Sequence, residues 1–453
     1  MKVFLANPPW HKPGFYGVRA GSRWPHYERE DMEYVPFPFF LGHAAAILVE
    51  DGFSTLLVDA VAEHLLEPPF LQTLEAFSPD LVLFEVSTSS IASDLALATE
   101  LRRRGFAGTL VFAGLHALMY EPGFLQEHPE VDVVLRGEYE YSLRDLCRAL
   151  RDGKTTETIP GLLLRRGNDL FDTGRRPPII DLDALPWPAR QFLPMLAYHD
   201  EPGNLERPSV QLWTSRGCPF RCTFCAWPQI MYGSNSYRTR SVRDVVDEIE
   251  WLERAYGFKS FYIDDDTFNV RRQRVVDFCE ELLRRRIDLP WASMCRADLM
   301  DETLLQTMRR AGLFAVKYGV ESASQALLDG MRKNLDVSKA IEVIRYTQKI
   351  GIKVHLTFVF GMPGETRESA EETLALALDL FPESLQFTIA TPFPGSLLFR
   401  ELEAAGKIET YDFDRYDGFH TAVMGTEGLP REELQAFVAD ANRRWQHARY
   451  GVC

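Results

Sequence analysis

Short apolar runs alternate with helical patterns over the first third of the chain. Continuous apolar runs of this length are typical of parallel strands that are buried on both faces. The candidate strands cover residues 2–9, 54–60, 80–88, 108–116 and 131–138. The helical patterns between them cover residues 41–52, 68–77 and 93–105. This alternation predicts an α/β fold that begins with a doubly wound, Rossmann-like domain over residues 1–164.

Polar residues follow each of these candidate strands. In a doubly wound domain the ligand lies outside the carboxyl ends of the strands. The residues that emerge there are Asn7, Asp59, Ser87, His116 and Glu138. We therefore expect any ligand of this domain at that edge.

A hairpin pattern and a proline-rich stretch come next. The hairpin is predicted at residues 160–176, and prolines recur between Pro177 and Pro194. Proline cannot continue a helix or an inner strand. Residues 165–207 are therefore predicted to form a hairpin and a linker.

The alternation of strands and helices restarts at residue 208. Six candidate strands occupy residues 209–215, 259–266, 289–298, 314–322, 353–361 and 384–392. Repeated right-handed crossovers curl a parallel sheet into a barrel or part of one, with chemistry on the loops that follow the strands. Residues 208–400 are therefore predicted to form a partial (β/α)6 barrel. Residues 401–453 are predicted to form a small C-terminal cap.

Charge and hydropathy narrow the class of protein. The 453 residues include 50 Lys and Arg against 65 Asp and Glu, which gives a formal net charge of −15. Nucleic-acid binding needs a basic face, so this balance argues against it and suits a cationic small molecule. The chain has no apolar run long enough to cross a membrane, and its start lacks the apolar core of a signal peptide. We expect a cytoplasmic protein with no nucleic-acid or membrane partner.

Three cysteines follow the first predicted barrel strand. Cys218, Cys222 and Cys225 are spaced C-x3-C-x2-C within the stretch SRGCPFRCTFC. Structural zinc prefers four ligands, so a zinc-stabilised binding module would need a fourth, such as Cys279 or Cys295. A cubane iron–sulfur cluster held by three thiolates instead leaves one iron open to a ligand. Both interpretations stand at this point.

The cysteine loop resembles the signature of the radical S-adenosylmethionine (SAM) superfamily. Phe224 stands where that family places an aromatic residue before the third cysteine. The resemblance implies a [4Fe-4S] cluster on the three cysteines, with SAM on the open iron. It also implies an electron from a one-electron reductant, which cleaves SAM to a 5′-deoxyadenosyl radical. That radical abstracts hydrogen from a small-molecule substrate.

Further matches to this family lie after the later barrel strands. Glu321 and Ser322 end the stretch GVES, Arg296 lies in MCRAD, and Gly361 lies in FGMPGE. The resemblance implies that these four residues contact SAM. Glycine at such a turn lets the backbone approach a ligand closely.

The order of the two domains resembles the superfamily's subclass with an N-terminal cobalamin-binding domain. The stretches NPP, GLH and RGEYE match parts of the subclass pattern. The pattern is altered at Ala113 and Tyr139, each of which replaces a usual glycine. A tyrosine can fill the space that glycine would leave for the cobalamin tail. The residues leave open whether this domain binds cobalamin.

The reaction is predicted from the second barrel strand, which ends in three acids. Asp264, Asp265 and Asp266 are candidate catalytic groups, of which strand geometry allows at most two to face the cavity. Lys317, Tyr318 and His355 are further candidates, for each of which a core or solvated position is the simpler interpretation. The favoured reaction is radical dehydration of a diol in an amino sugar, as in the radical SAM diol dehydratases of aminoglycoside antibiotic biosynthesis. The alternative is cobalamin-dependent methylation at carbon.

Overall fold

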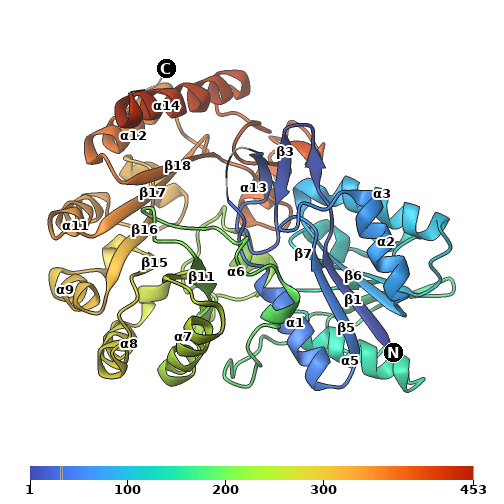
Figure 1. Cartoon of the computed structure of the whole chain (residues 1–453). Helices are drawn as coiled ribbons and strands as arrows, with labels where there is room; N and C mark the ends of the chain where they lie inside the picture. Colours follow the sequence, from blue (N-terminus) through green and yellow to red (C-terminus); the bar gives the residue numbers. More distant parts are fainter. Residues whose placement is uncertain (31, 33, 452–453) are drawn as a thin grey trace.

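A computed structural model describes residues 1–30, 32 and 34–451 and contains two large sheets side by side, one mostly and one wholly parallel (Figure 1). The first sheet has seven strands in the order β10-β9-β8-β7-β6-β1-β5. Its parallel strands are β1 (Lys2–Asn7), β5 (Ser54–Asp59), β6 (Leu81–Val86), β7 (Thr109–Gly114) and β8 (Val133–Leu135). All five strands predicted for this domain are present, and the α/β fold is confirmed.

Helices cover both faces of this sheet. They are α1 (Phe39–Glu50), α2 (Glu67–Phe77), α3 (Ile91–Arg103), α4 (Pro122–Glu127) and α5 (Glu140–Arg151). The strands are mostly apolar because each face packs under helices, and Phe4 and Leu5 accordingly lie in separate core clusters. In chain order the parallel strands run 2-1-3-4-5, so the order reverses between β1 and β6. A ligand crevice is expected at that reversal.

A small antiparallel sheet between β1 and α1 was not predicted. It consists of β2 (His11–Lys12), β3 (Phe15–Val18) and β4 (His26–Arg29). These strands of two to four residues are too short to show an alternating pattern. In Figure 1, β3 lies beyond the carboxyl ends of the large sheet, between the two halves of the molecule.

The predicted hairpin belongs to the first sheet. Strands β9 (Leu162–Arg166) and β10 (Asp169–Asp172) pair antiparallel, and β9 also pairs antiparallel with β8. A domain boundary at residue 164 would therefore divide β9. The irregular connection to the second sheet begins after Asp172.

The second sheet is parallel, with six strands in the order β11-β14-β15-β16-β17-β18. The strands are β11 (Ser209–Leu212), β14 (Ser260–Ile263), β15 (Trp291–Cys295), β16 (Leu313–Glu321), β17 (Lys353–Phe360) and β18 (Ser384–Ile389). Helices α7 (Val242–Tyr256), α8 (Arg272–Arg285), α9 (Glu302–Arg310), α11 (Val337–Lys349) and α12 (Arg367–Leu380) lie around its outer side (Figure 1). This curled, open sheet is the predicted partial barrel.

Alternate residues of the barrel strands face opposite sides. In β16, Val316, Tyr318 and Val320 belong to the core under the helices. Lys317 and Gly319 line a cavity on the inner side. The barrel interior is therefore partly polar, and it is there that a substrate can bind.

The linker closes one end of the barrel interior. Leu205 packs with Tyr262, Ala292 and Ala315. Gly203 lies so close to the barrel that an added Cβ would come 2.8 Å from the Cβ of Ala315. The remaining opening is at the other end, where the strands finish.

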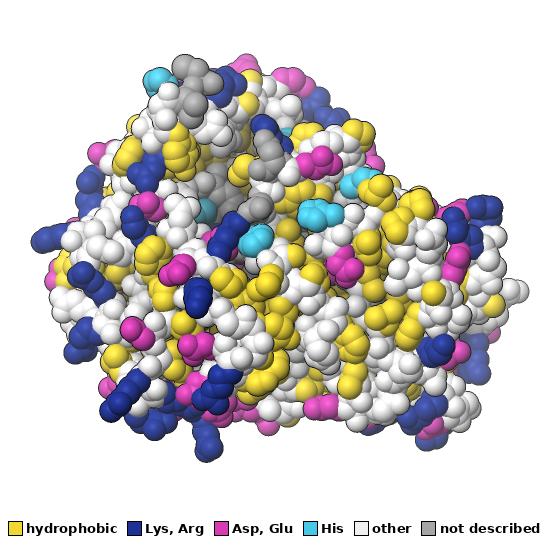
Figure 2. Space-filling model, in the orientation of Figure 1, with side chains coloured by type: hydrophobic (Ala, Val, Ile, Leu, Met, Phe, Trp, Pro, Cys, Tyr) yellow, Lys and Arg dark blue, Asp and Glu magenta, His cyan; other side chains and the backbone are white. Residues whose placement is uncertain are grey.

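The C-terminal part packs beside the last barrel strands. Helix α13 (Leu397–Ala404) follows β18, and the final helix α14 (Arg431–Tyr450) places Phe437 5.1 Å from the Phe360 ring. The last two residues of the predicted cap lie outside the described residues. Of the helices described, none combines the length and apolar character that crossing a membrane requires. On the face in Figure 2, Lys and Arg side chains are scattered among acidic and neutral ones.

Candidate functional site

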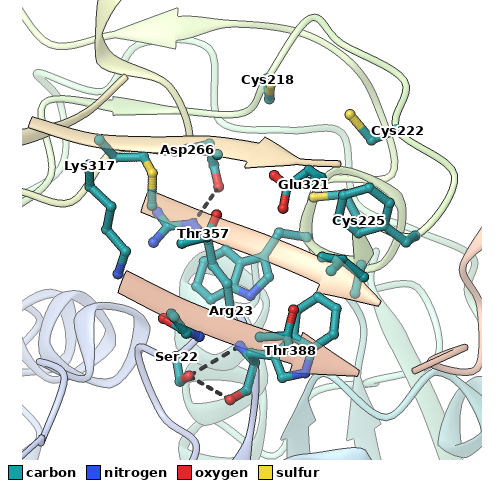
Figure 3. A pocket seen from close by; sticks show the side chains of 18 of the residues that line it. Ser22, Arg23, Cys218, Cys222, Cys225, Asp266, Lys317, Glu321, Thr357 and Thr388 are labelled. Atoms are coloured by element: carbon teal, nitrogen blue, oxygen red, sulfur yellow. Dashed lines mark hydrogen bonds and ion pairs between the residues drawn. The ribbon is translucent and has the colours of Figure 1, made fainter. Parts of the chain in front are cut away.

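The three cysteines line one cavity at the open end of the barrel. The cavity has a volume of about 210 Å³. Cys218, Cys222 and Cys225 lie between β12 (Ser215–Arg216) and the short helix α6 (Ala226–Ile230). Figure 3 shows their side chains on the same side of the cavity as Glu321.

Two of the three predicted acids hold the cysteine loop in place. The Asp265 carboxylate accepts hydrogen bonds from the backbone N–H of Thr214 (2.6 Å) and of Ser215 (3.0 Å), and from both hydroxyls. Asp266 accepts one from the Gly217 N–H (2.9 Å). Asp264 and Asp266 line the cavity, whereas Asp265 turns toward the loop.

Three thiols are the donor set of a four-iron cluster that keeps one iron open. Among the described residues, no three His, Cys, Asp or Glu side chains converge closely enough to hold one metal ion. A four-iron cluster binds each thiolate to a different iron, so it needs them spaced around a larger body. Cys279, which could have completed a zinc site, is buried in α8 outside the cavity. The donor set fits a [4Fe-4S] cluster.

The predicted SAM contact Glu321 lines the cavity in a strained conformation. Its φ is +71°, where β16 shifts register against β17. A non-glycine residue rarely adopts this conformation, and such strain concentrates at binding sites. Its carboxylate lies 2.6 Å from the Lys333 ammonium, and both side chains are buried. The two residues offer a carboxylate and an ammonium to the polar groups of a ligand beside the cysteines.

Arg296 and Phe224 also lie beside the cysteines. The Arg296 guanidinium is paired with Asp298 (2.8 Å) and stacks over the Phe220 ring at 3.7 Å from its centroid. Burial raises the pKa of the Cys222 thiol, while the positive charges of Lys333 and Arg296 act in the opposite direction. These cations would stabilise a thiolate-bound cluster.

Two residues predicted to contact SAM lie away from the cavity. The Ser322 hydroxyl is fully buried and bonds to Thr373 (3.2 Å) and to the Ser324 N–H. Gly361 has φ +91°, and an added Cβ would meet Leu434 of α14 at 2.4 Å. Gly361 is thus needed for packing of the C-terminal helix, and its backbone N–H donates to the Glu365 carboxylate.

A polar floor lies on the side of the cavity away from the cysteines. Lys317 of β16 and Asp200 of the linker face each other, with 4.0 Å between Nζ and Oδ1, and each side chain is only 9% exposed. Neither makes a hydrogen bond within the part of the chain that the structure describes. The hydroxyl of Tyr262 and Nε2 of His355 are also buried with no partner among the described residues, although neither side chain lines the cavity. Such unsatisfied groups indicate a site for a polar ligand.

Asp264, which also lines this floor, has a pKa near neutral pH. Burial raises its pKa to about 7, and the neighbouring Asp200 adds to that effect, while Arg23 and Lys317 oppose it. The Arg23 guanidinium lies 2.6 Å from Asp264 and 3.3 Å from Asp266. Figure 3 shows the Arg23 side chain inside the cavity, joined to Asp266. Asp264 can therefore exchange a proton near neutral pH.

The part of the first sheet's carboxyl edge that faces the barrel is filled by the chain's own side chains. Tyr139 is fully buried, and its hydroxyl donates to Glu85 (2.5 Å). Asn7, Asp59 and Glu138, expected to meet a ligand, are bonded to other side chains. A cavity of about 340 Å³ lies at the ends of β1 and β5, beside Trp10, Ala60 and His64. At the ends of β6 and β7, the space left among Arg19, Glu85 and Ser87 is about 10 Å³, about one water. These residues do not fit cobalamin.

Several residues of the site were not predicted. Arg23, Asp200 and Lys333 line the cavity but lie in irregular segments without a motif. Their neighbours along the sequence give no signal, because tertiary packing alone brings them to the barrel. Lys317, by contrast, was named as a further candidate from the sequence, and it lines the cavity.

Comparison with known proteins identifies the class. The family model of the radical SAM superfamily matches residues 214–377. The anaerobic magnesium-protoporphyrin IX monomethyl ester cyclase of Rubrivivax gelatinosus is 30% identical, and the match covers 98% of this chain and 77% of the cyclase. The cytidylyl-2-hydroxyethylphosphonate methyltransferase of Streptomyces wedmorensis is 27% identical over 93% of this chain and 88% of that enzyme. The chain therefore belongs to the radical SAM superfamily.

A solved structure shares the two-domain fold. The radical SAM methyltransferase TsrM from Kitasatospora setae, with cobalamin and a [4Fe-4S] cluster bound, matches with a TM-score of 0.73 at 18% identity, covering 98% of this chain and 88% of TsrM. The predicted resemblance to the subclass with a cobalamin-binding-type domain is confirmed for the fold. As a member of the superfamily, the protein is a radical SAM enzyme that uses a [4Fe-4S] cluster and SAM.

Proposed function

We propose that this enzyme removes water from a vicinal diol in a polyhydroxylated amine, such as an amino sugar. The observation that carries the proposal is the polar floor. Asp264, Asp200 and Lys317 face the cavity opposite the cysteines, and Lys317 and Asp200 lack hydrogen-bond partners among the described residues. A substrate with hydroxyl and ammonium groups would supply those partners.

The groups of the floor suit the two proton transfers of a dehydration. The cluster and SAM, when bound, supply the radical that removes a hydrogen atom from a substrate carbon. Asp264 then accepts the proton of the hydroxyl on that carbon, and Lys317 donates a proton to the neighbouring hydroxyl. The neighbouring C–O bond breaks and water leaves, which produces a carbonyl beside a carbon radical. One electron from the reductant and one proton complete the product.

Asp200 is proposed to bind the substrate ammonium. Its carboxylate is almost fully buried, and burial raises its pKa while Lys317 opposes that effect. Three carboxylates, Asp200, Asp264 and Asp266, face the two cations Lys317 and Arg23 here. A substrate ammonium would compensate the remaining negative charge. This arrangement favours amines over neutral sugars.

The test uses the reconstituted enzyme with SAM, a strong reductant and a panel of amino sugars that carry a vicinal diol. The matching neutral sugars serve as controls. We expect 5′-deoxyadenosine together with a product that is lighter by one water, formed from an amine and without cobalamin. Deuterium on the attacked carbon should appear in 5′-deoxyadenosine. A product that retains both hydroxyls would refute the dehydration.

A second candidate is cobalamin-dependent methylation. It is supported by the relatives, since the Streptomyces wedmorensis protein is named a methyltransferase. The same incubation distinguishes it, because methylation adds one carbon and requires added cobalamin. The filled edge of the first sheet weighs against this candidate.

A further inference from the structure

The crevice where the strand order reverses is occupied by Arg19. This residue follows β3, and its side chain is 1% exposed. Its guanidinium donates to Asn7 Oδ1 (2.8 Å) and to the Pro8 carbonyl (2.5 Å). Asn7 is the last residue of β1, and Pro8 follows it. It also pairs with Asp94 of α3 at 2.6 Å. A doubly wound domain would place its ligand in this crevice.

The same segment continues from the crevice to the barrel. Gly21, with φ +79°, passes so close to Phe37 that an added Cβ would lie 2.2 Å from its carbonyl oxygen. Two residues further, Arg23 reaches Asp264 and Asp266 of the barrel. Residues 19–24 therefore connect the edge of the first sheet with the floor of the active site.

Trp24 fills the space between the two domains at the cysteine loop. Its ring lies 6.4 Å from that of Phe224 and 5.5 Å from that of Phe393. An added Cβ on Gly418 would lie 1.5 Å from Trp24 Nε1, so the indole is in tight contact with the C-terminal region. A planar cofactor could lie between the first sheet and the cysteines only by displacing this ring.

We infer that residues 19–24 take the place of an organic cofactor between the two domains. The first domain then excludes cobalamin, and it uses this segment to hold Arg23 against the active-site acids. The inference concerns this chain's own residues and is independent of the reaction proposed above. Removing Arg19 alone would leave Asp94 as an uncompensated buried charge, so a double variant is the better probe.

The test measures cobalamin retention directly. Wild type and Arg19→Ala/Asp94→Ala are reconstituted with iron and sulfide, incubated with aquacobalamin and desalted. Retained corrin absorption is compared with protein concentration, and circular dichroism verifies that the double variant is folded. Hydrogen exchange of residues 19–24 is measured with and without aquacobalamin.

We expect the wild type to retain no corrin and to show the same slow exchange in both conditions. We expect the folded double variant to gain corrin retention, together with faster exchange in the segment. Stoichiometric retention by the wild type would overturn the inference. Absence of retention in a folded double variant would overturn the assignment of the exclusion to Arg19. If the double variant does not fold, Trp24→Gly replaces it in the same comparison. A gain of corrin retention in this variant would support the inference, and no retention would contradict it.

Discussion

The carboxyl edges of the two parallel sheets differ in what fills them. At the first edge, Arg19 and Tyr139 are bonded to buried side chains, and the cavity at the ends of β6 and β7 is about 10 Å³. At the second, the cysteines and Lys317 face a cavity of about 210 Å³. Both edges are places where their folds bind ligands. The fold therefore determines where a ligand could bind. Buried polar side chains without hydrogen-bond partners indicate which of the two edges binds one.

The largest expected effect comes from the cysteines at the open edge. Replacing Cys222 with Ala should abolish the cluster and all 5′-deoxyadenosine formation, because an iron would lose its thiolate. Iron and sulfide content and absorption near ~400 nm measure this. Cys295→Ser is the matched control, since Cys295 lines the same cavity outside the cysteine loop. Loss of the cluster in the control would instead indicate that Cys295 is a ligand.

The next effect concerns proton transfer at the floor. Asp264→Asn should lower product formation by roughly 10²- to 10⁴-fold, while 5′-deoxyadenosine still forms without product. Because a base must be deprotonated, the wild-type rate should rise as the pH rises through about 7, the pKa to which burial raises Asp264. The Asn variant should lose this dependence. An unchanged pH profile would show that another group is the base.

A smaller effect tests the contact between the two regions. The positive charge of Arg23 opposes the rise in the pKa of Asp264. Arg23→Gln should therefore move the rising part of the pH–rate profile to higher pH. Arg23→Lys keeps the charge and should leave the profile closer to that of the wild type. Equal profiles in the two variants would contradict the electrostatic role.

The two edges also differ in how far the sequence predicts them. The cysteine spacing, Glu321 and the acids after β14 were recognisable, because their chemistry depends on residues close together in sequence. The strand periodicity predicted both sheets for the same local reason. The roles of Arg19 and Arg23 could not be predicted from the sequence. Their partners lie up to 243 residues away, and only tertiary packing brings them together. Tyr139 was recognised as a departure from the subclass pattern, but its bond to Glu85 required the structure.

The smallest effect is expected at the closed edge. Tyr139→Phe removes the donor to Glu85 and should lower the free energy of unfolding by about 1–3 kcal/mol, with no change in 5′-deoxyadenosine formation. Burial raises the pKa of Glu85 to about 7, so folding favours its protonated form and stability falls as the pH rises through that value. The Tyr139 hydroxyl lowers that pKa by stabilising the carboxylate. The variant should therefore lose more stability above about pH 7 than below it.

Thermal unfolding at about pH 5.5 and about pH 8.5 measures this difference. Tyr318→Phe is the matched control: this tyrosine is equally buried, but its hydroxyl bonds to Thr347 (3.4 Å) and not to a carboxylate. Its loss of stability should be the same at both pH values. If Tyr139→Phe instead changed the yield of 5′-deoxyadenosine, the closed edge would take part in catalysis, and the contrast between the two edges would fail. If Tyr139→Phe lowers only the stability of the protein, the carboxyl edge of the first sheet, where this fold usually binds a ligand, serves here as part of the structural core.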